Sequence, residues 1–349
     1  VCAFGGVLVG DAPDLIFLKD NDGDGQADVR RVVVNGFGTS NVQQLPNSFQ
    51  WGIDNRIYGA SGGNGGQLKQ VAFPEAAWFE NKIIQPSPPT DVNGRDFVID
   101  PILFRVAAIA GGTQFGMTFD RWGARFVCSN SNHCQQIVFE DKYAGRNPQQ
   151  RVARSRTNIA KDGPDAEVFR ISRVEPWRKV RTRLRVQGLV RGPIEGGGRA
   201  AGYFTGATGV TIYRGDAWPS QWNGLAIVGD VGSNLVHRKR LEPDGLKFIA
   251  SRIDEQSEFV TSSDIWFRPA QFANAPDGSL HVIDVCREVI EHPKSLPPDI
   301  KRHLDLTAGR DRGRVYRIVP RGFQHRRTPR RADASTAELV KTLAHSNAW

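Results

Sequence analysis

The chain has 349 residues, including 37 Gly and 20 Pro, and its formal net charge is +9. That length suits one large all-β domain or two ordinary domains. No run of about 18 apolar residues occurs, so no transmembrane segment is expected in it. Because the chain opens on Val1 within a strand pattern and stops at Trp349 within a helical one, we interpret it as an internal fragment.

The first distinctive segment is an acidic loop between two predicted strands, 14–18 and 29–34. Carboxylates occupy loop positions 1, 3, 5 and 9, and glycine occupies position 6, which is the spacing of a calcium-binding loop. Position 12 is Arg31, which excludes the helix–loop–helix version of this motif. We therefore expect structural calcium, and the alternative is a solvated acidic turn. The predicted ligands are Asp20, Asp22, Asp24, the carbonyl of Gln26, and Asp28.

Four segments share a strand–turn–strand pattern with an apolar approach, a tight polar turn and an alternating apolar exit. Turns such as Asp54-Asn55 and Asp277-Gly278 admit positive φ and suit hairpins. Irregular spacing of such units indicates blades with long insertions between them. We therefore expect an all-β, six-bladed β-propeller with a truncated first blade, and an open β-sandwich is the alternative. The segments are 51–59, 115–127, 222–230 and 276–284.

Two further features concern cysteine and basic residues. Cys128 and Cys134 could pair across a hairpin in an oxidising compartment, or could be two buried thiols. Residues 146–191 hold 13 Lys and Arg against 4 acids, and residues 310–331 hold 9 Arg against 1 acid. Arginines alternate along 181–185 and would share one strand face. Without interleaved aromatic residues, these segments predict a solvated basic face or a dock for an acidic partner, and no nucleic acid.

Several motifs resemble the glucose/sorbosone dehydrogenase family. Residues 207–219, 222–224 and 234–241 resemble one blade of that family, and residues 268–283 with 313–318 resemble its final blade. The match extends over residues 7–320. It is closest to a branch named for membrane-bound dehydrogenases, through the acidic loop and short motifs at 94–97, 114–116, 129–133, 146–148, 175–178, 202–205 and 290–293.

The resemblance implies a domain organisation and a compartment. Residues 1–320 would form the propeller, 321–334 a basic linker, and 335–349 the start of a helical repeat domain. A capping box at Ser335 and Glu338 supports that last helix. Proteins of this branch are secreted and often carry a c-type cytochrome domain, so we expect a periplasmic or extracellular location and a cytochrome domain or partner.

The family's sugar dehydrogenases use pyrroloquinoline quinone, a histidine base, and arginines and a lysine that hold the cofactor. Gln114 stands at the base position, and an amide cannot take a proton near neutral pH. The lysine position falls near Gly232, and of the arginine pair only Arg268 remains. These differences argue against the quinone cofactor. The candidate cofactor- or substrate-binding residues are Gln114, Arg199, His237 and Arg268.

Two functional hypotheses therefore remain open. One is a dehydrogenase-like propeller that oxidises sugars or related alcohols and passes electrons to a c-type cytochrome. The other is a non-catalytic, calcium-stabilised propeller that binds carbohydrate or a protein partner. The resemblance favours the first hypothesis, and the missing base and lysine favour the second.

Overall fold

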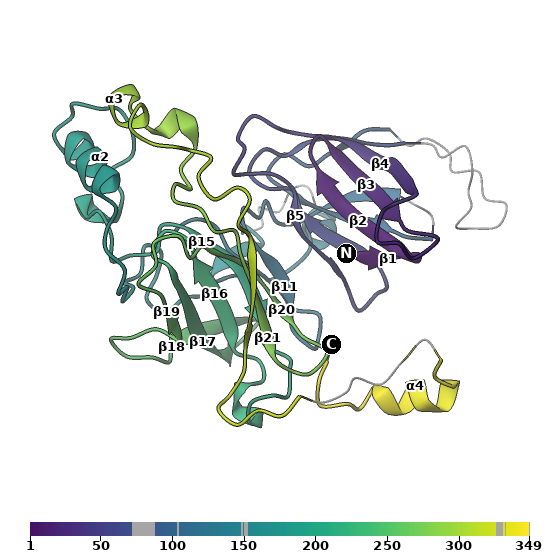
Figure 1. The fold of residues 1–349 in the computed structure, drawn as a ribbon. Coiled ribbons are helices and arrows are strands. Elements are labelled where there is room, and N and C mark those ends of the chain that lie inside the picture. The colour runs from purple at the N-terminus through teal and green to yellow at the C-terminus, as the bar shows by residue number, and fades with distance from the viewer. Residues whose placement is uncertain are drawn as a thin grey trace. The chain divides into compact units, whose positions relative to one another are not determined.

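The computed structural model describes residues 1–71, 88–102, 105–147, 149, 153–325, 331 and 333–348 (Figure 1). The chain divides into two compact units, each with its own internal contacts. The first unit comprises Val1–Thr118, Trp122–Ser129 and Gln135–Thr157, and the second comprises Phe119–Arg121, Asn130–Cys134 and Asn158–Trp349.

Antiparallel sheets built from short hairpins dominate the first unit. A six-stranded sheet has the order β1-β2-β3-β4-β7-β8, and a four-stranded sheet has the order β10-β9-β6-β5. The strands of the first sheet are β1 (Cys2–Ala3), β2 (Gly6–Asp11), β3 (Asp14–Lys19), β4 (Val29–Phe37), β7 (Gly66–Gln70) and β8 (Thr90–Asp91). Those of the second are β5 (Asn47–Trp51), β6 (Ile57–Ala60), β9 (Asp96–Asp100) and β10 (Arg105–Ile109).

A third sheet has the order β11-β12-β13-β14 and is made of three-residue strands. They are β11 (Met117–Phe119), β12 (Arg125–Val127), β13 (Gln135–Ile137) and β14 (Arg156–Asn158). All three residues of each of the first three strands are buried. Four of these nine buried residues are polar or charged, namely Thr118, Arg125, Gln135 and Gln136.

The second unit contains two antiparallel sheets. One has the order β15-β16-β17-β18, with β19 also paired to β17, and the other has the order β20-β21-β22. β15 packs against β20 of the neighbouring sheet. The strands are β15 (Ala207–Ile212), β16 (Ala226–Asp230), β17 (Leu235–Asp244), β18 (Lys247–Arg252), β19 (Val260–Thr261), β20 (Pro269–Asn274), β21 (Leu280–Asp284) and β22 (Arg314–Ile318).

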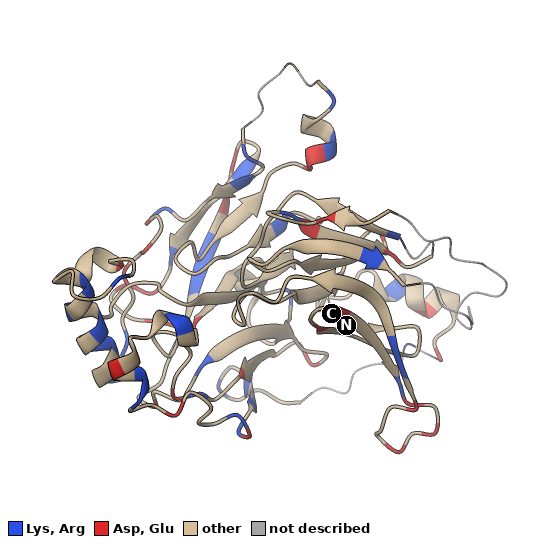
Figure 2. Ribbon diagram, turned by 90° about the horizontal axis from the view of Figure 1, so that it is seen from above, with Lys and Arg blue, Asp and Glu red and all other residues tan. Residues whose placement is uncertain are grey.

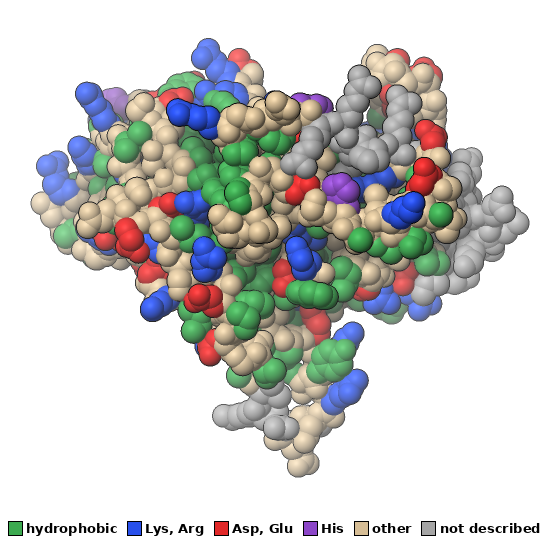
Figure 3. Space-filling model, turned by 90° about the horizontal axis from the view of Figure 1, so that it is seen from below, with side chains coloured by type: hydrophobic (Ala, Val, Ile, Leu, Met, Phe, Trp, Pro, Cys, Tyr) green, Lys and Arg blue, Asp and Glu red, His purple; other side chains and the backbone are tan. Residues whose placement is uncertain are grey.

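Each unit buries its own apolar cluster. In the first unit Phe17, Phe37 and Phe97 pack with aliphatic residues from β2, β4, β7 and β9. In the second unit Tyr213 and Phe272 pack with residues of β16, β17 and β21. Burial of these side chains supplies the main favourable free energy of folding. On the face drawn in Figure 3, charged side chains are dispersed among apolar ones.

Within the part of the chain that the structure describes, helices are few and short. They are α1 (Asp141–Ala144), α2 (Pro176–Val186), α3 (Pro298–Lys301) and α4 (Thr336–Thr342), with 3-10 turns η1 (Gly196–Gly198), η2 (Ser220–Trp222) and η3 (Pro293–Ser295). The predicted strand at 181–185 is wrong, because these residues belong to α2. Arg181 and Arg185 are one turn apart on its buried side, whereas Arg183 is exposed. The basic face predicted there is therefore only partly solvated.

The structure confirms the hairpins predicted at 51–59, 115–127 and 276–284. The prediction at 222–230 is wrong, because Trp222 belongs to η2 and only one strand, β16, follows it. Asn55 and Gly278 have positive φ of 59° and 82°, and their flanking strands pair as Trp51 with Ile57 and Asn274 with Leu280. The strands expected around the acidic loop are also confirmed as β3 and β4. The fold is thus mostly β and propeller-like in its succession of antiparallel sheets. Five such sheets occur in the described residues, and a sixth blade stays a prediction.

Three remaining expectations concern the cysteines and the tail. Cys128 and Cys134 are buried thiols that form no disulfide, so the disulfide alternative is wrong. The capping box of Ser335 and Glu338 is confirmed at the start of α4. Of the expected basic linker 321–334, residues 326–330 and 332 lie outside the described residues. Among the described residues, no helix is long and apolar enough to cross a bilayer.

Candidate functional site

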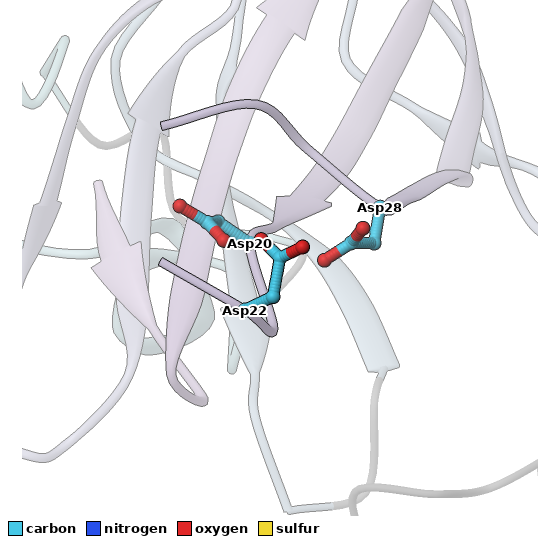
Figure 4. Close-up of side chains that lie close together, drawn as sticks. All are labelled: Asp20, Asp22 and Asp28. Atoms are coloured by element: carbon cyan, nitrogen blue, oxygen red, sulfur yellow. The ribbon is translucent and has the colours of Figure 1, made fainter. Parts of the chain in front are cut away.

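The acidic loop joins β3 to β4 in the first unit. Carboxylate oxygens of Asp20, Asp22 and Asp28 lie within 4.8 Å of one another (Figure 4). The amides of Gly23 and Gly25 donate to Asp20 at 2.7 and 2.9 Å, and these bonds lower the pKa of Asp20. Three ionised oxygen ligands at this spacing suit a hard cation such as calcium.

Two of the five predicted calcium ligands stand apart from this cluster. Asp24 accepts the backbone N–H of Gln26 at 2.7 Å, and its side chain is not part of the three-carboxylate group. The side-chain amide of Gln26 donates to Asp24 at 3.2 Å. The loop therefore brings Asp20, Asp22 and Asp28 together, while a ligand role for Asp24 and for the Gln26 carbonyl stays a prediction.

Gln114, at the resembled family's base position, is half-buried in the first unit. Its backbone carbonyl accepts a hydrogen bond from the Asn47 side chain at 2.9 Å. The aligned base of the family is a histidine, and neither nitrogen nor oxygen of a glutamine amide can store a proton near neutral pH. The structure therefore offers no proton acceptor in the side chain of Gln114.

Arg268 is fully buried and is held by hydrogen bonds. Its guanidinium donates to the carbonyls of Arg287, Val231 and Glu288 at 2.9, 2.7 and 2.7 Å, and to Glu175 at 3.0 Å. A guanidinium has five N–H donors, so these bonds occupy most of its capacity. Arg268 consequently joins three parts of the chain, and it is not placed to hold a ligand.

Two more arginines share the Glu175 carboxylate. Arg178 and Arg170 lie 3.5 and 3.7 Å from it, and Glu175 itself is buried. Burial works to raise the pKa of Glu175, but the charges of Arg178 and Arg268 hold it below its ordinary value. A side chain built on Gly232 would meet the Arg178 guanidinium at 3.3 Å. Arg178 thus supplies positive charge beside the position where the resembled family has lysine.

His237 forms a buried pair with Glu258. Its Nδ1 lies 2.5 Å from a Glu258 carboxylate oxygen, while its Nε2 is buried without a hydrogen-bond partner among the described residues. Desolvation lowers the pKa of His237, and the hydrogen bond to Glu258 only partly opposes that effect. Burial works to raise the pKa of Glu258, but His237 holds it below the ordinary value. The pair is therefore neutral imidazole and carboxylate, with the Nε2 lone pair available.

A second buried histidine lies beside the first. The ring centroids of His133 and His237 are 5.8 Å apart, and Phe204 stacks on His133 at 4.1 Å. His133 Nε2 lies 3.5 Å from Asp162, and burial lowers the pKa of His133 to about 3. Two carboxylate–histidine pairs thus face each other within the second unit, and both imidazoles are neutral near pH 7.

Lys239 completes this cluster. Its buried ammonium donates to both oxygens of Asp162 at 2.7 and 2.8 Å. The Asp162 side chain is 31% exposed, so it marks the side of the cluster nearest to solvent. Desolvation lowers the pKa of Lys239, and Asp162 opposes this.

Arg199 lies on the surface after η1. Its Nε donates to the carbonyl of Gly196 at 2.9 Å, and its guanidinium stacks on Tyr203 at 5.4 Å. Sequence reasoning placed His237 among the candidates but missed its partner Glu258 and Lys239. The hydropathy pattern could have indicated this cluster, because strand β17 carries the polar residues His237 and Lys239 on its buried face, where apolar residues are usual.

A family model described as a domain of unknown function, DUF7133, matches residues 1–322. The chain belongs to this family. No curated protein matches this DUF7133 chain.

Solved structures give partial matches to the DUF7133 chain. A luciferin-regenerating enzyme matches at 9% identity with a TM-score of 0.44, covering 92% of this chain and 76% of the enzyme. A soluble aldose sugar dehydrogenase from Escherichia coli matches at 13% identity with a TM-score of 0.39, covering 80% and 73%. A glucose dehydrogenase matches at 12% identity with a TM-score of 0.40, covering 79% and 72%.

Proposed function

We propose that this DUF7133 chain is a dehydrogenase-like propeller that oxidises an alcohol carbon of a sugar or related small alcohol. The observation that carries the proposal is the Glu258–His237 pair, a buried neutral imidazole with a free Nε2 lone pair. A positioned imidazole is the commonest general base in enzymes. In this proposal His237 takes the hydroxyl proton on Nε2 and Glu258 stabilises the imidazolium that forms, while the hydride on the alcohol carbon would pass to a bound two-electron acceptor, whose place the dye takes in the assay.

The residues at the resembled family's positions do not fit pyrroloquinoline quinone. The Gln114 side chain cannot act as a base, and four N–H groups of Arg268 already donate to backbone carbonyls and to Glu175. Arg178 contributes charge near Gly232, but it shares Glu175 with two other arginines. No step of the proposed reaction is therefore assigned to the quinone.

The wider setting is part of the same proposal. Electrons would pass to a c-type cytochrome domain or partner, and the protein would act in the periplasm or outside the cell. The propeller would have six blades, with α4 beginning a helical repeat domain. The acidic loop would bind calcium through Asp20, Asp22 and Asp28, supported by the spacing of their oxygens, and the ion would stabilise the β3–β4 hairpin.

Dye-linked oxidation of a panel of aldoses and small alcohols tests the proposal. Assays are run with and without added quinone and calcium, on the wild type, His237→Gln and the control His281→Gln. Since general-base catalysis typically contributes about 10² to 10⁴-fold in rate, His237→Gln should lose about that factor, and His281→Gln should not. Thermal unfolding of each variant checks the fold. Equal turnover in wild type and His237→Gln would overturn the assignment.

A non-catalytic role is the second candidate, and a specific observation favours it. His237 is 0% exposed, so an alcohol reaches Nε2 only if the cluster opens. In this alternative the calcium-stabilised propeller binds carbohydrate or a protein partner and performs no chemistry. Calorimetric binding of a sugar that the wild type does not oxidise, unchanged in His237→Gln, would select this candidate over the first.

A further inference from the structure

The surface formed by α2 and the loop after it combines basic and exposed apolar side chains. Residues 176–194 contain six Lys and Arg and no acidic residue. Figure 2 shows basic residues along α2. Leu189, Ile194 and Val186 are 70%, 57% and 52% exposed, and Val180 is 38% exposed. Contiguous exposed apolar side chains on a folded protein commonly mark an interaction site.

Helical geometry separates the two sides of α2. Arg178, Arg181 and Arg185 face inward with Trp177, where Arg181 pairs with Glu291 at 2.8 Å and both Arg178 and Arg181 lie over the Trp177 ring. Lys179 and Arg183 are one turn apart on the opposite side, and Val186 follows there. The outward side therefore carries cations and aliphatic groups together.

The loop after α2 is fixed rather than loosely attached. Gly188 has φ of 70° and ends the helix, and the amides of Leu189 and Val190 donate to the Leu184 carbonyl at 2.9 and 3.3 Å. On the inner side, Arg185 donates to the carbonyl of Ser295 at 3.1 Å. Leu189 is thereby held outward, so little conformational entropy would be lost when it is buried by a partner.

We propose that this surface, formed by Lys179, Val180, Arg183, Val186, Leu189, Arg191 and Ile194, binds the surface of an anionic lipid bilayer. Cationic side chains would contact lipid phosphates, while the aliphatic ones enter the boundary between headgroups and acyl chains. Because residues 176–194 include no acidic residue, the charge of this surface is complementary to that of an anionic bilayer. A purely acidic polymer would use the cations but would leave Leu189 and Ile194 exposed to water.

Vesicle co-sedimentation of the full chain tests this at about 0.1 M salt, a concentration at which electrostatics still act over roughly 10 Å. Phosphatidylcholine vesicles are compared with vesicles containing phosphatidylglycerol. Wild type should bind only the anionic vesicles. The triple variant Lys179→Glu, Arg183→Glu, Arg191→Glu should lose on the order of 100-fold or more in partitioning, because each basic residue near the membrane contributes appreciably. The double variant Leu189→Ser, Ile194→Ser should also lose binding.

A matched charge control keeps the test specific. The control is a triple variant with the same change in net charge at exposed positions of the same unit, namely Lys161→Glu, Arg240→Glu and Lys247→Glu. This control variant should retain most of the vesicle binding. Because all substituted side chains are exposed, unfolding midpoints should stay near that of the wild type. Equal loss in the control would overturn the proposal. Loss in the charge variant without loss in the apolar variant would instead indicate an acidic protein or polymer, and would overturn it too.

Discussion

The ion pair between Lys239 and Asp162 gives the sharpest stability prediction. The Lys239 side chain is 0% exposed, and its ammonium donates to both Asp162 oxygens at 2.7 and 2.8 Å. Asp162→Asn removes the negative charge and leaves the ammonium buried. Breaking a buried pair in this way costs about 3–5 kcal/mol, because the remaining charge is neither paired nor hydrated.

The reverse substitution should be milder. Lys239→Met fills the same space with apolar atoms, and the remaining Asp162 is 31% exposed and can be hydrated. We therefore expect a smaller loss of stability than for Asp162→Asn. The control is Asp244→Asn, because the Asp244–Lys247 pair is exposed and spans 3.5 Å. Exposed pairs of this kind contribute about 0–1 kcal/mol.

Urea unfolding monitored by tryptophan fluorescence, together with thermal unfolding, measures these differences. For a unit of this size, about 3–5 kcal/mol corresponds to a fall in Tm on the order of 10 °C. Asp162→Asn should show that fall, Lys239→Met a smaller one, and Asp244→Asn almost none. A Tm of Asp162→Asn within the range of the Asp244→Asn control would refute the reasoning about the buried ammonium.

Three further predictions follow from other sites. Calcium should raise the Tm of the wild type but not of Asp22→Asn with Asp28→Asn, and identical wild-type melting in calcium and in chelator would exclude the calcium site. The pKa of His133 is depressed to about 3 in the folded protein, so its contribution to stability is present above pH 6.5 and is lost as the pH falls towards 3. The loss between pH 7 and pH 5 should be about 2 kcal/mol. Urea unfolding of His133→Asn should show a flatter dependence of stability on pH than the wild type, and an unchanged slope would contradict this. Glu175→Gln should lower stability by about 3–5 kcal/mol because Arg170, Arg178 and Arg268 share that carboxylate, and a calorimetric Tm equal to that of wild type would disprove the shared role.

Local signals in the sequence were enough to predict the hairpins and the acidic loop. Turns such as Asp54-Asn55 and Asp277-Gly278 depend on residues that are neighbours in the chain, so their conformation follows from composition. The loop carboxylates likewise approach one another within nine residues of sequence. Both features were therefore predictable without knowledge of tertiary contacts.

Helix α2 was missed because its buried side is made of arginine. Arg178, Arg181 and Arg185 replace the apolar stripe that normally identifies an amphipathic helix, so the alternation of 181–185 was interpreted as a strand. Pro176 at the first helical turn was an overlooked signal. Their burial is explained by partners distant or local in the chain, because Arg181 pairs with Glu291, Arg178 with Glu175, and Arg185 donates to the Ser295 carbonyl.

The buried histidine cluster depends on long-range packing. His133, Asp162, His237 and Glu258 come from separate segments, and no local motif joins them. Sequence reasoning could nominate His237, but it could not supply the carboxylate that orients its ring. Clusters of this kind can be identified only once the three-dimensional arrangement of the strands is known.

The most direct test of the proposed function compares two substitutions in one dye-linked oxidation assay. The account predicts that His237→Gln lowers kcat by about 10² to 10⁴-fold, whereas Gln114→Ala leaves kcat near the wild-type value, because only the imidazole can accept the hydroxyl proton. The opposite pattern, with activity lost in Gln114→Ala and retained in His237→Gln, would contradict the central claim.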